Sequence, residues 1–192
     1  ALIRDDQPVI LSFEQVEITF NVDERRIFAS GFSNGSDFVL TRMAPEMNDV
    51  FAAFSTAGVG PYPQGGGDES AAVGINTSIY SIFGTQDAKV AEGTGYTLPF
   101  PFTGEEILND PLFADTFQRA TAMLNLENAY TLESEAPFTR FTFAESTADA
   151  GNEYIFMMIL DMGHVYPNGE NNRADADAAD LFWEFFMRHP RP

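Results

Sequence analysis

The chain has 192 residues, 44% hydrophobic and 14% aromatic, and its 29 Asp and Glu against 10 Lys and Arg give a formal net charge of -19. This length suits one domain with a sizeable core. A surface this acidic repels the phosphates of nucleic acid and anionic lipid, and we therefore expect neither nucleic acid nor a membrane as a partner. The absence of cysteine excludes disulfides, thiolate metal sites and a cysteine nucleophile. The sequence contains neither an apolar run of eighteen residues nor a signal-peptide pattern, and we therefore expect no membrane span.

The predicted elements alternate between helix and strand. In the first half we expect a helix at 7–20, a strand at 26–31, a helix at 34–44, a buried strand at 49–57 and a strand at 78–84. In the second half we expect one long or two short helices in 105–127, extended runs at 140–145 and 154–161, and a helix from about 174 to 189. Residues 58–74 are rich in Gly and Pro and too long for a routine connection, which predicts a surface loop beside a site. Alternation of this kind predicts an α/β domain with a mostly parallel sheet.

The pentapeptide Gly31-Phe32-Ser33-Asn34-Gly35 lies where the first strand pattern gives way to a helix pattern. A serine hydroxyl is a poor nucleophile, so an enzyme that uses one must expose it, place a histidine beside it and offer donors to the oxyanion. A tight strand-to-helix turn meets these needs if both glycines remove side chains that would collide, and if the Asn34 amide faces the developing negative charge. Glycine-rich loops often contain the same pattern by chance, but its position between strand and helix favours a catalytic Ser33.

The chain has two histidines. His189 ends the last predicted helix, where an exposed position that complements the helix dipole is the simpler interpretation. His164 follows the apolar run at 154–160, so we expect it at the carboxyl end of a strand, where open α/β sheets gather their sites. The sequence therefore predicts His164 as the partner of Ser33.

The acid of a triad should lie between the serine and the histidine in the chain. Asp87 leaves the carboxyl end of the strand at 78–84 by way of Gly84, and we expect it to be that acid. The alternatives are Asp161, Asp149, Asp68 and Glu69. Asp161 is so close to His164 in sequence that capping a strand is its simpler role, and the acids of the 58–74 loop precede the relevant strand.

Four blocks, in order, resemble segments of the extracellular polyhydroxybutyrate depolymerase and feruloyl esterase family of α/β-hydrolases. They are VDERRIFASGFSNGSDF, APEMNDVFAAFSTAGVG, FGTQDAKV and GHVYPNG. The third resembles the family's H-G-T-x-D turn, with Phe83 in place of its histidine, and the fourth resembles its G-H-x-W-P-G turn, with Tyr166 in place of tryptophan. The ending ADAADLFWEFFMRHP is similar to the family's last helix, and only residues 91–139, a variable insertion, show little to align. The resemblance implies a single α/β-hydrolase-like domain over residues 1–192, the C-terminal part of that fold.

The resemblance also implies roles for individual residues. Ser33 would be the nucleophile, His164 the general base and then acid, Asp87 the acid that orients the imidazole, and Asn34 an oxyanion-hole donor through its amide. We further expect the substrate to contact Phe32, Tyr62 and Tyr166.

The function implied is hydrolysis of carboxylic esters through an acyl-enzyme, by a secreted or extracellular protein. Short-chain or aromatic esters are the expected substrates, and a hydroxyalkanoate polyester is the narrower possibility. We expect no cofactor and no metal, since the two histidines are far apart and the acids lack calcium-loop spacing. The alternatives are a catalytically impaired binding or assembly module, and an acyltransferase or peptidase that uses the same triad.

One departure from the family concerns the start of the fold. Family members have several strands and a helix before the part that resembles residue 1, and a loop there supplies a second oxyanion-hole amide. The strand at 26–31 would then lack a neighbour on one side, and an uncovered strand edge pairs readily. We therefore expect a homodimer, or association with a missing N-terminal segment.

Overall fold

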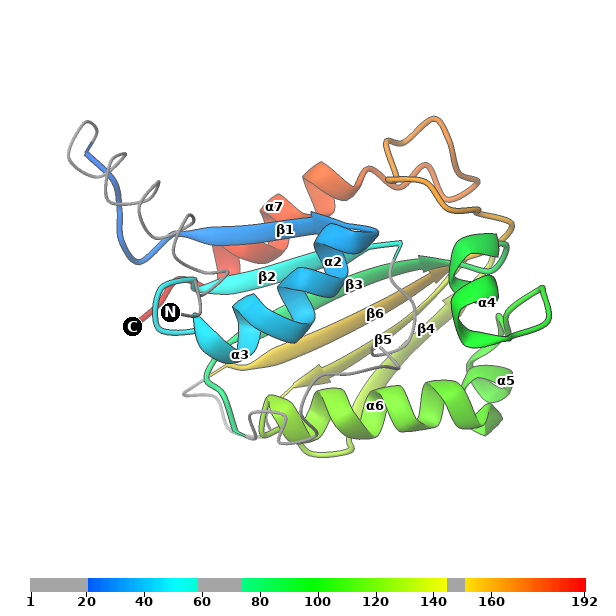
Figure 1. The fold of residues 1–192 in the computed structure, drawn as a ribbon, viewed down its shortest axis with the longest axis horizontal. Coiled ribbons are helices and arrows are strands. Elements are labelled where there is room, and N and C mark those ends of the chain that lie inside the picture. Colours follow the sequence, from blue (N-terminus) through cyan, green and yellow to red (C-terminus); the bar gives the residue numbers. More distant parts are fainter. Residues whose placement is uncertain (1–20, 59–73, 145–150) are drawn as a thin grey trace, which may run out of the picture.

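A computed structural model describes residues 21–58, 74–144 and 151–192. In these residues the backbone forms a six-stranded sheet in the order β1-β2-β3-β6-β5-β4, with helices on both faces (Figure 1). The strands β1, β2, β3 and β6 are mutually parallel, whereas β5 and β4 are antiparallel to their neighbours. The predicted α/β class with a mostly parallel sheet is therefore confirmed.

The strands and helices have the following bounds. The strands are β1 (Phe28–Phe32), β2 (Ala53–Ala57), β3 (Ser78–Gly84), β4 (Tyr130–Glu135), β5 (Phe138–Ala144) and β6 (Glu153–Ile159). The helices are α2 (Asn34–Phe38), the π-helical turn η1 (Val39–Met43), α3 (Ala44–Glu46), α4 (Ala88–Thr94), α5 (Gly104–Asn109), α6 (Pro111–Met123) and α7 (Ala178–Arg188).

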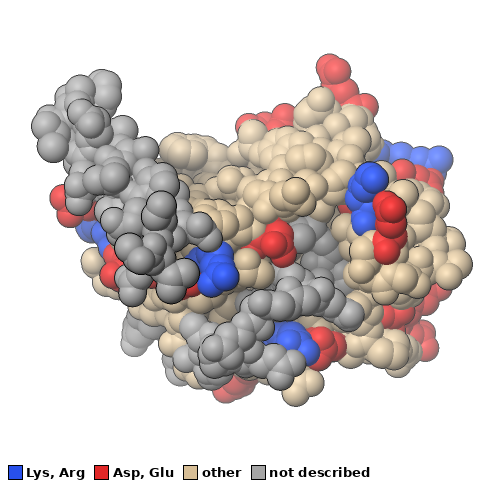
Figure 2. Space-filling model, in the orientation of Figure 1, with Lys and Arg blue, Asp and Glu red and all other residues tan. Residues whose placement is uncertain are grey.

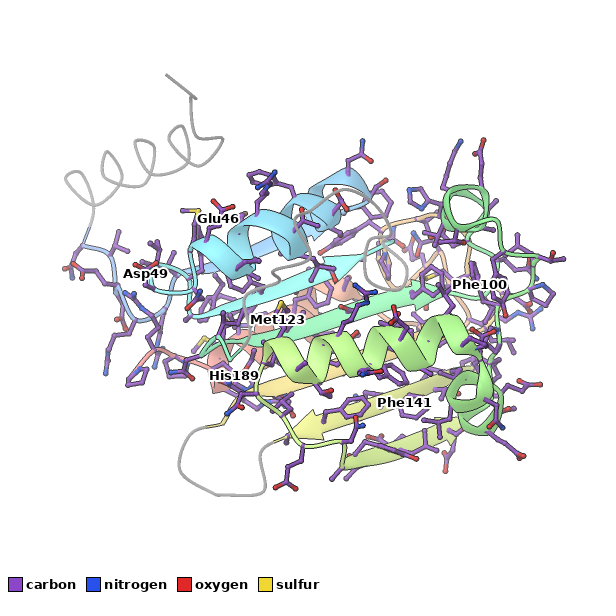
Figure 3. All side chains as sticks on the ribbon, turned by 60° about the horizontal axis from the view of Figure 1, so that its bottom comes forward. Glu46, Asp49, Phe100, Met123, Phe141 and His189 are labelled. Carbon is purple, nitrogen blue, oxygen red and sulfur yellow. The ribbon has the colours of Figure 1, made fainter. Side chains whose placement is uncertain are left out.

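The sheet separates two apolar cores, because successive side chains of a strand point to opposite faces. In β3, Ile79 and Phe83 belong to the core beneath α2, α3 and α6, whereas Tyr80 and Ile82 belong to the core beneath α7. The first core is rich in aromatic rings that contact one another, and Phe141 of β5 lies under α6 (Figure 3). Burial on both faces explains why the central strands are almost continuously apolar.

Several predicted elements keep their place but change their ends. The strand at 78–84 is confirmed without change, and the region 105–127 holds two helices, α5 and α6. The strand predicted at 49–57 begins only at residue 53, since the amides of Val50 and Phe51 donate to the Met47 carbonyl and form a turn. The predicted helix at 7–20 lies outside the described residues.

The helix predicted from about 174 to 189 is shorter, spanning 178–188. Ahead of it, the Asn172 side chain accepts from the amides of Ala174 and Ala176 and holds a loop. The helix begins where the Asp177 carboxylate accepts from the Ala179 amide as an N-cap.

The sequence prediction missed β4 and α4. Every residue of β4 is exposed, and its sequence YTLESE alternates apolar and polar residues only as far as Glu133, which is too short a pattern to indicate a half-buried strand. It is held by pairing with β5, where the Arg140 guanidinium contacts both oxygens of Glu133 at 2.7 Å. Helix α4 is only seven residues long and is capped by Asp87.

The charges are concentrated at the surface. Figure 2 shows acidic side chains at several places on one face, with uncharged surface between them. Among the helices that the structure describes, none combines the length and apolarity that crossing a membrane requires.

Candidate active site

Ser33 lies at the turn between β1 and α2, with backbone angles φ 54° and ψ -121°. A positive φ is uncommon for a residue other than glycine, and such strained conformations concentrate at functional sites. The turn is held by a hydrogen bond from the Ser33 amide to the Ala57 carbonyl at 3.0 Å. The predicted strand-to-helix elbow is therefore present.

The two glycines of the pentapeptide have different environments. A side chain at Gly31 would collide with the backbone of Gly35 and Ser36, so only glycine fits there. At Gly35 an added Cβ would meet no atom of the described residues within 4 Å. The expectation that both glycines prevent a collision is therefore confirmed for Gly31, whereas among the described residues Gly35 has no such neighbour.

Asp87 is fully buried at the carboxyl end of β3. One carboxylate oxygen accepts hydrogen bonds from the amides of Lys89 and Val90, both at 3.1 Å, so the side chain also caps α4. Gly84 allows the chain to pass close to β6 before it reaches Asp87, because a side chain at residue 84 would collide with the backbone of Met162 after β6. The cap and the glycine fix the carboxylate between the ends of two strands.

His164 connects Asp87 and Ser33. Its Nδ1 lies 3.0 Å from each oxygen of Asp87, and its Nε2 lies 2.8 Å from the Ser33 hydroxyl. The carboxylate can only accept, so Nδ1–H donates to it and Nε2 is free to accept the serine proton. The side chain of His164 is 21% exposed, whereas that of Asp87 is inaccessible.

The three residues are far apart in the chain, by 131 positions from Ser33 to His164 and 77 from Asp87 to His164. They meet because β1, β3 and β6 are parallel, so that the segments following these strands emerge at the same edge of the sheet. The structure thus brings together all three residues that the sequence predicted for the triad.

Aromatic side chains lie beside these residues. The Phe32 ring is 5.1 Å from the His164 ring and 6.1 Å from the Tyr166 ring, between ring centroids. Tyr166 is partly exposed, and burial, followed by the charge of Asp177, raises the pKa of its hydroxyl. Two of the three predicted substrate contacts are therefore near Ser33, and the third, Tyr62, lies outside the described residues.

Asp161, the alternative acid that lies within the described residues, does not join the triad. Asp161 is exposed, and its carboxylate pairs with Arg173 at 2.8 Å, while its amide donates to the Thr85 hydroxyl. Asp149, Asp68 and Glu69 lie outside the described residues.

His189 is not exposed as predicted, since only 12% of its side chain is accessible. The ring packs against Phe185 and donates from Nδ1 to the Phe185 carbonyl at the end of α7. Burial lowers the pKa of His189, and the charge of Arg188 lowers it further. The hydrogen bond to the Phe185 carbonyl and the charge of Glu153 raise it, but by less. The expectation of an exposed residue was wrong because the last turn of α7 lies against the protein.

The Asn34 amide is the first of α2, and within the described residues it has no hydrogen-bond acceptor. A helix begins with such unpaired amides. The described ranges contain no group of three or more His, Asp or Glu side chains placed to hold a metal ion.

Two residues of the site were not found from sequence. Ser36 is buried and holds the elbow against β2, and Gly58 lies against Phe32 and His164. Their only sequence signal was position, directly after the G-x-S-x-G pattern and directly after the strand at 49–57.

No protein-family model and no curated protein matches this chain.

Proposed function

We propose that the protein is a serine esterase of the α/β-hydrolase type, related to the polyhydroxybutyrate depolymerase and feruloyl esterase family. The observation that carries this proposal is the continuous chain of hydrogen bonds from Asp87 through His164 to Ser33. A strained serine at a strand-to-helix turn, in the chain order serine, acid, histidine, supports the same assignment.

In the proposed reaction, Ser33 Oγ attacks the ester carbonyl while His164 Nε2 takes its proton. The imidazolium then gives that proton to the departing alcohol, and the acyl group stays on Ser33. A water molecule, activated by the same nitrogen, attacks the acyl-enzyme and releases the carboxylic acid. Asp87 stays ionised throughout, because it orients the imidazole and stabilises its positive charge.

The tetrahedral intermediate carries an oxyanion that needs hydrogen-bond donors. The Asn34 amide, which has no acceptor among the described residues, is a donor next to Ser33. Removal of one such donor typically costs about a hundred- to a thousand-fold in rate, so a second donor would add much to turnover.

The substrates are proposed to be short-chain or aromatic esters, with a hydroxyalkanoate polyester as a narrower candidate, acted on outside the cell. The apolar rings of Phe32 and Tyr166 beside the serine support an apolar substrate. No step of this mechanism requires a metal or a cofactor.

The test is covalent labelling with a fluorophosphonate, followed by intact-mass measurement. We expect the wild-type chain to gain one adduct and Ser33→Ala to gain none. Hydrolysis of p-nitrophenyl esters of increasing acyl length, with the same pair of proteins, then defines the acyl preference. An unlabelled wild-type chain that hydrolyses none of these esters would instead indicate a binding or assembly module.

Product analysis separates ester hydrolysis from other uses of the same triad. With an added alcohol, an acyltransferase forms a new ester, and a peptidase cleaves peptide substrates in place of esters. We expect the free acid as the main product.

A further inference from the structure

We infer that Phe32 and Gly58 together position the His164 imidazole, so that Phe32 acts on the reaction through His164. This inference goes beyond the proposed function and depends on it only for the effect on turnover. It assigns Phe32 a role other than the substrate contact expected from the sequence.

The hydrogen bonds of His164 do not by themselves fix the tilt of its ring. Its two partners, Asp87 and Ser33, bind the two ring nitrogens. A hydrogen bond tolerates some departure from linearity, and the χ2 torsion of histidine has a broad energy profile. Small tilts of the ring are therefore limited only when another group packs against it.

The Phe32 ring lies where it can limit that tilt. Its centroid is 5.1 Å from that of His164, with 33° between the ring planes. Tyr166 packs edge-on against Phe32, with an interplanar angle of 87°. Since Phe32 directly precedes Ser33, the same turn fixes both the nucleophile and the ring that supports its base.

Gly58 provides the space for this arrangement. It follows β2 with φ +61°, and a Cβ added there would lie 2.6 Å from Phe32 Cε2 and 3.3 Å from His164 Cε1. The first distance is impossible without displacement, and the atom approached belongs to a ring that His164 and Tyr166 already confine. A side chain at position 58 would therefore displace Phe32, and with it His164.

The experiment compares Gly58→Ala with Gly95→Ala. Gly95 also has a positive φ, +71°, but an added Cβ there meets no atom within 4 Å in the part of the chain that the structure describes. Both variants place alanine in a left-handed conformation, but only Gly58→Ala pushes on Phe32. We expect Gly58→Ala to lower kcat by about ten- to a hundred-fold with little change in KM, as expected for misplacement of a catalytic group. Gly95→Ala should leave kcat unchanged.

The second measurement is the NMR signal of the His164 Hε1 proton in the resting protein, which requires no activity. We expect this signal to move in Gly58→Ala and in Phe32→Leu, because the ring current of Phe32 changes at that proton. Phe32→Tyr, which retains the ring, should keep the wild-type position of the signal. Gly95→Ala should leave the signal in place.

A double variant distinguishes positioning from two unrelated effects. Leucine at position 32 removes the ring that the new Cβ would strike, so adding Gly58→Ala to Phe32→Leu should cost little further kcat. Additive losses of kcat in the double variant would overturn the inference. An Hε1 signal that stays in place in Gly58→Ala would also overturn it. If neither the wild type nor any variant hydrolyses esters, the NMR comparison still decides the positioning, while the fluorophosphonate result decides the function.

Discussion

The buried Ser36 hydroxyl lies within hydrogen-bond distance of both the amide and the carbonyl of Ala57. The Ser36 hydroxyl accepts from the Ala57 amide at 3.1 Å and lies 2.9 Å from the Ala57 carbonyl oxygen, with the Gly31 carbonyl, at 2.7 Å, as a second acceptor for its proton. Ser36 is fully buried. One side chain thus connects the first turn of α2 to the ends of β1 and β2, next to Ser33.

We predict that Ser36→Ala destabilises the protein by about 1–3 kcal/mol, because it leaves the buried Ala57 amide without an acceptor. Urea denaturation measures this difference. Thr41→Ala is the control, since the Thr41 hydroxyl donates to the Asp37 carbonyl in an exposed hydrogen bond, and its loss should stay within about 0.5 kcal/mol. Equal losses for the two variants would contradict the role given to Ser36.

We predict that Asp87→Asn lowers kcat by roughly three to four orders of magnitude while the fold persists. Asparagine can still accept from the amides of Lys89 and Val90 and cap α4. However, its NH2 group cannot accept from Nδ1–H, so His164 would adopt the wrong tautomer. Asp161→Asn is the control, since Asp161 is exposed and pairs with Arg173. Similar losses of kcat for the two variants would refute the choice of acid.

The sequence predicted the triad because parallel strands gather the residues that follow them at one edge. Ser33, Asp87 and His164 each follow an apolar run, and this local signal was enough to bring together residues far apart in the chain. The buried strand β3 was equally clear, because four of its seven residues are Ile, Tyr or Phe and it ends at a glycine.

The parts that were missed depend on tertiary contacts. The strand β4 is exposed on every residue, and it is held by its pairing with β5 and by the contacts of Tyr130 with Phe141 and Phe143. The burial of His189 depends on how α7 packs, which a helical pattern does not reveal. The need for glycine at position 58 comes from Phe32 and His164, which are distant in sequence, and no short pattern contains that information.

We predict that the protein loses stability between pH 7 and pH 5 in part through His189. Burial lowers the pKa of His189 in the folded protein, so the unfolded chain, with a value of about 6.5, takes up the proton first. Well above a pH of about 6.5, His189 is neutral in both the folded and the unfolded chain, so it does not change the free energy of unfolding. As the pH falls through about 6.5, the unfolded chain takes up the proton, and this uptake favours the unfolded state. Glu153, which raises this pKa, and Arg188, which lowers it, are the charged groups that face the ring.

The measurement is the free energy of unfolding of wild type and His189→Gln at both pH values. Glutamine retains an amide donor near the Phe185 carbonyl but does not titrate. We expect the wild-type protein to lose more stability than the variant as the pH falls. Parallel losses would show that His189 titrates alike in the folded and unfolded states.

The two edges of the described sheet differ in charge. The β4 edge carries Glu133 and Glu135, and charged side chains protect an edge against pairing. The strand β1 carries no charged residue, and in the described part of the chain it pairs with a strand on one side only. Beside it, α7 presents an apolar side: Phe186 stacks on Phe28 at 4.6 Å, and Trp183, three residues earlier on the same helix, is 60% exposed (Figure 1).

We predict that a second copy pairs with this edge about a two-fold axis perpendicular to the sheet. Such an axis keeps each face of the sheet on its own side, so the two α7 helices would meet and cover Trp183. Light scattering at micromolar concentration should give twice the mass of the 21.2 kDa chain. The dimer should strengthen as salt rises, because screening reduces the repulsion between copies of charge -19.

Trp183→Glu should dissociate the dimer. Leu132→Glu is the control, because Leu132 is also a large apolar side chain, 42% exposed, but lies on the β4 edge, and this variant should not dissociate the dimer. A wild-type chain that stays monomeric in high salt would exclude the pairing, and equal dissociation by both variants would place the contact elsewhere.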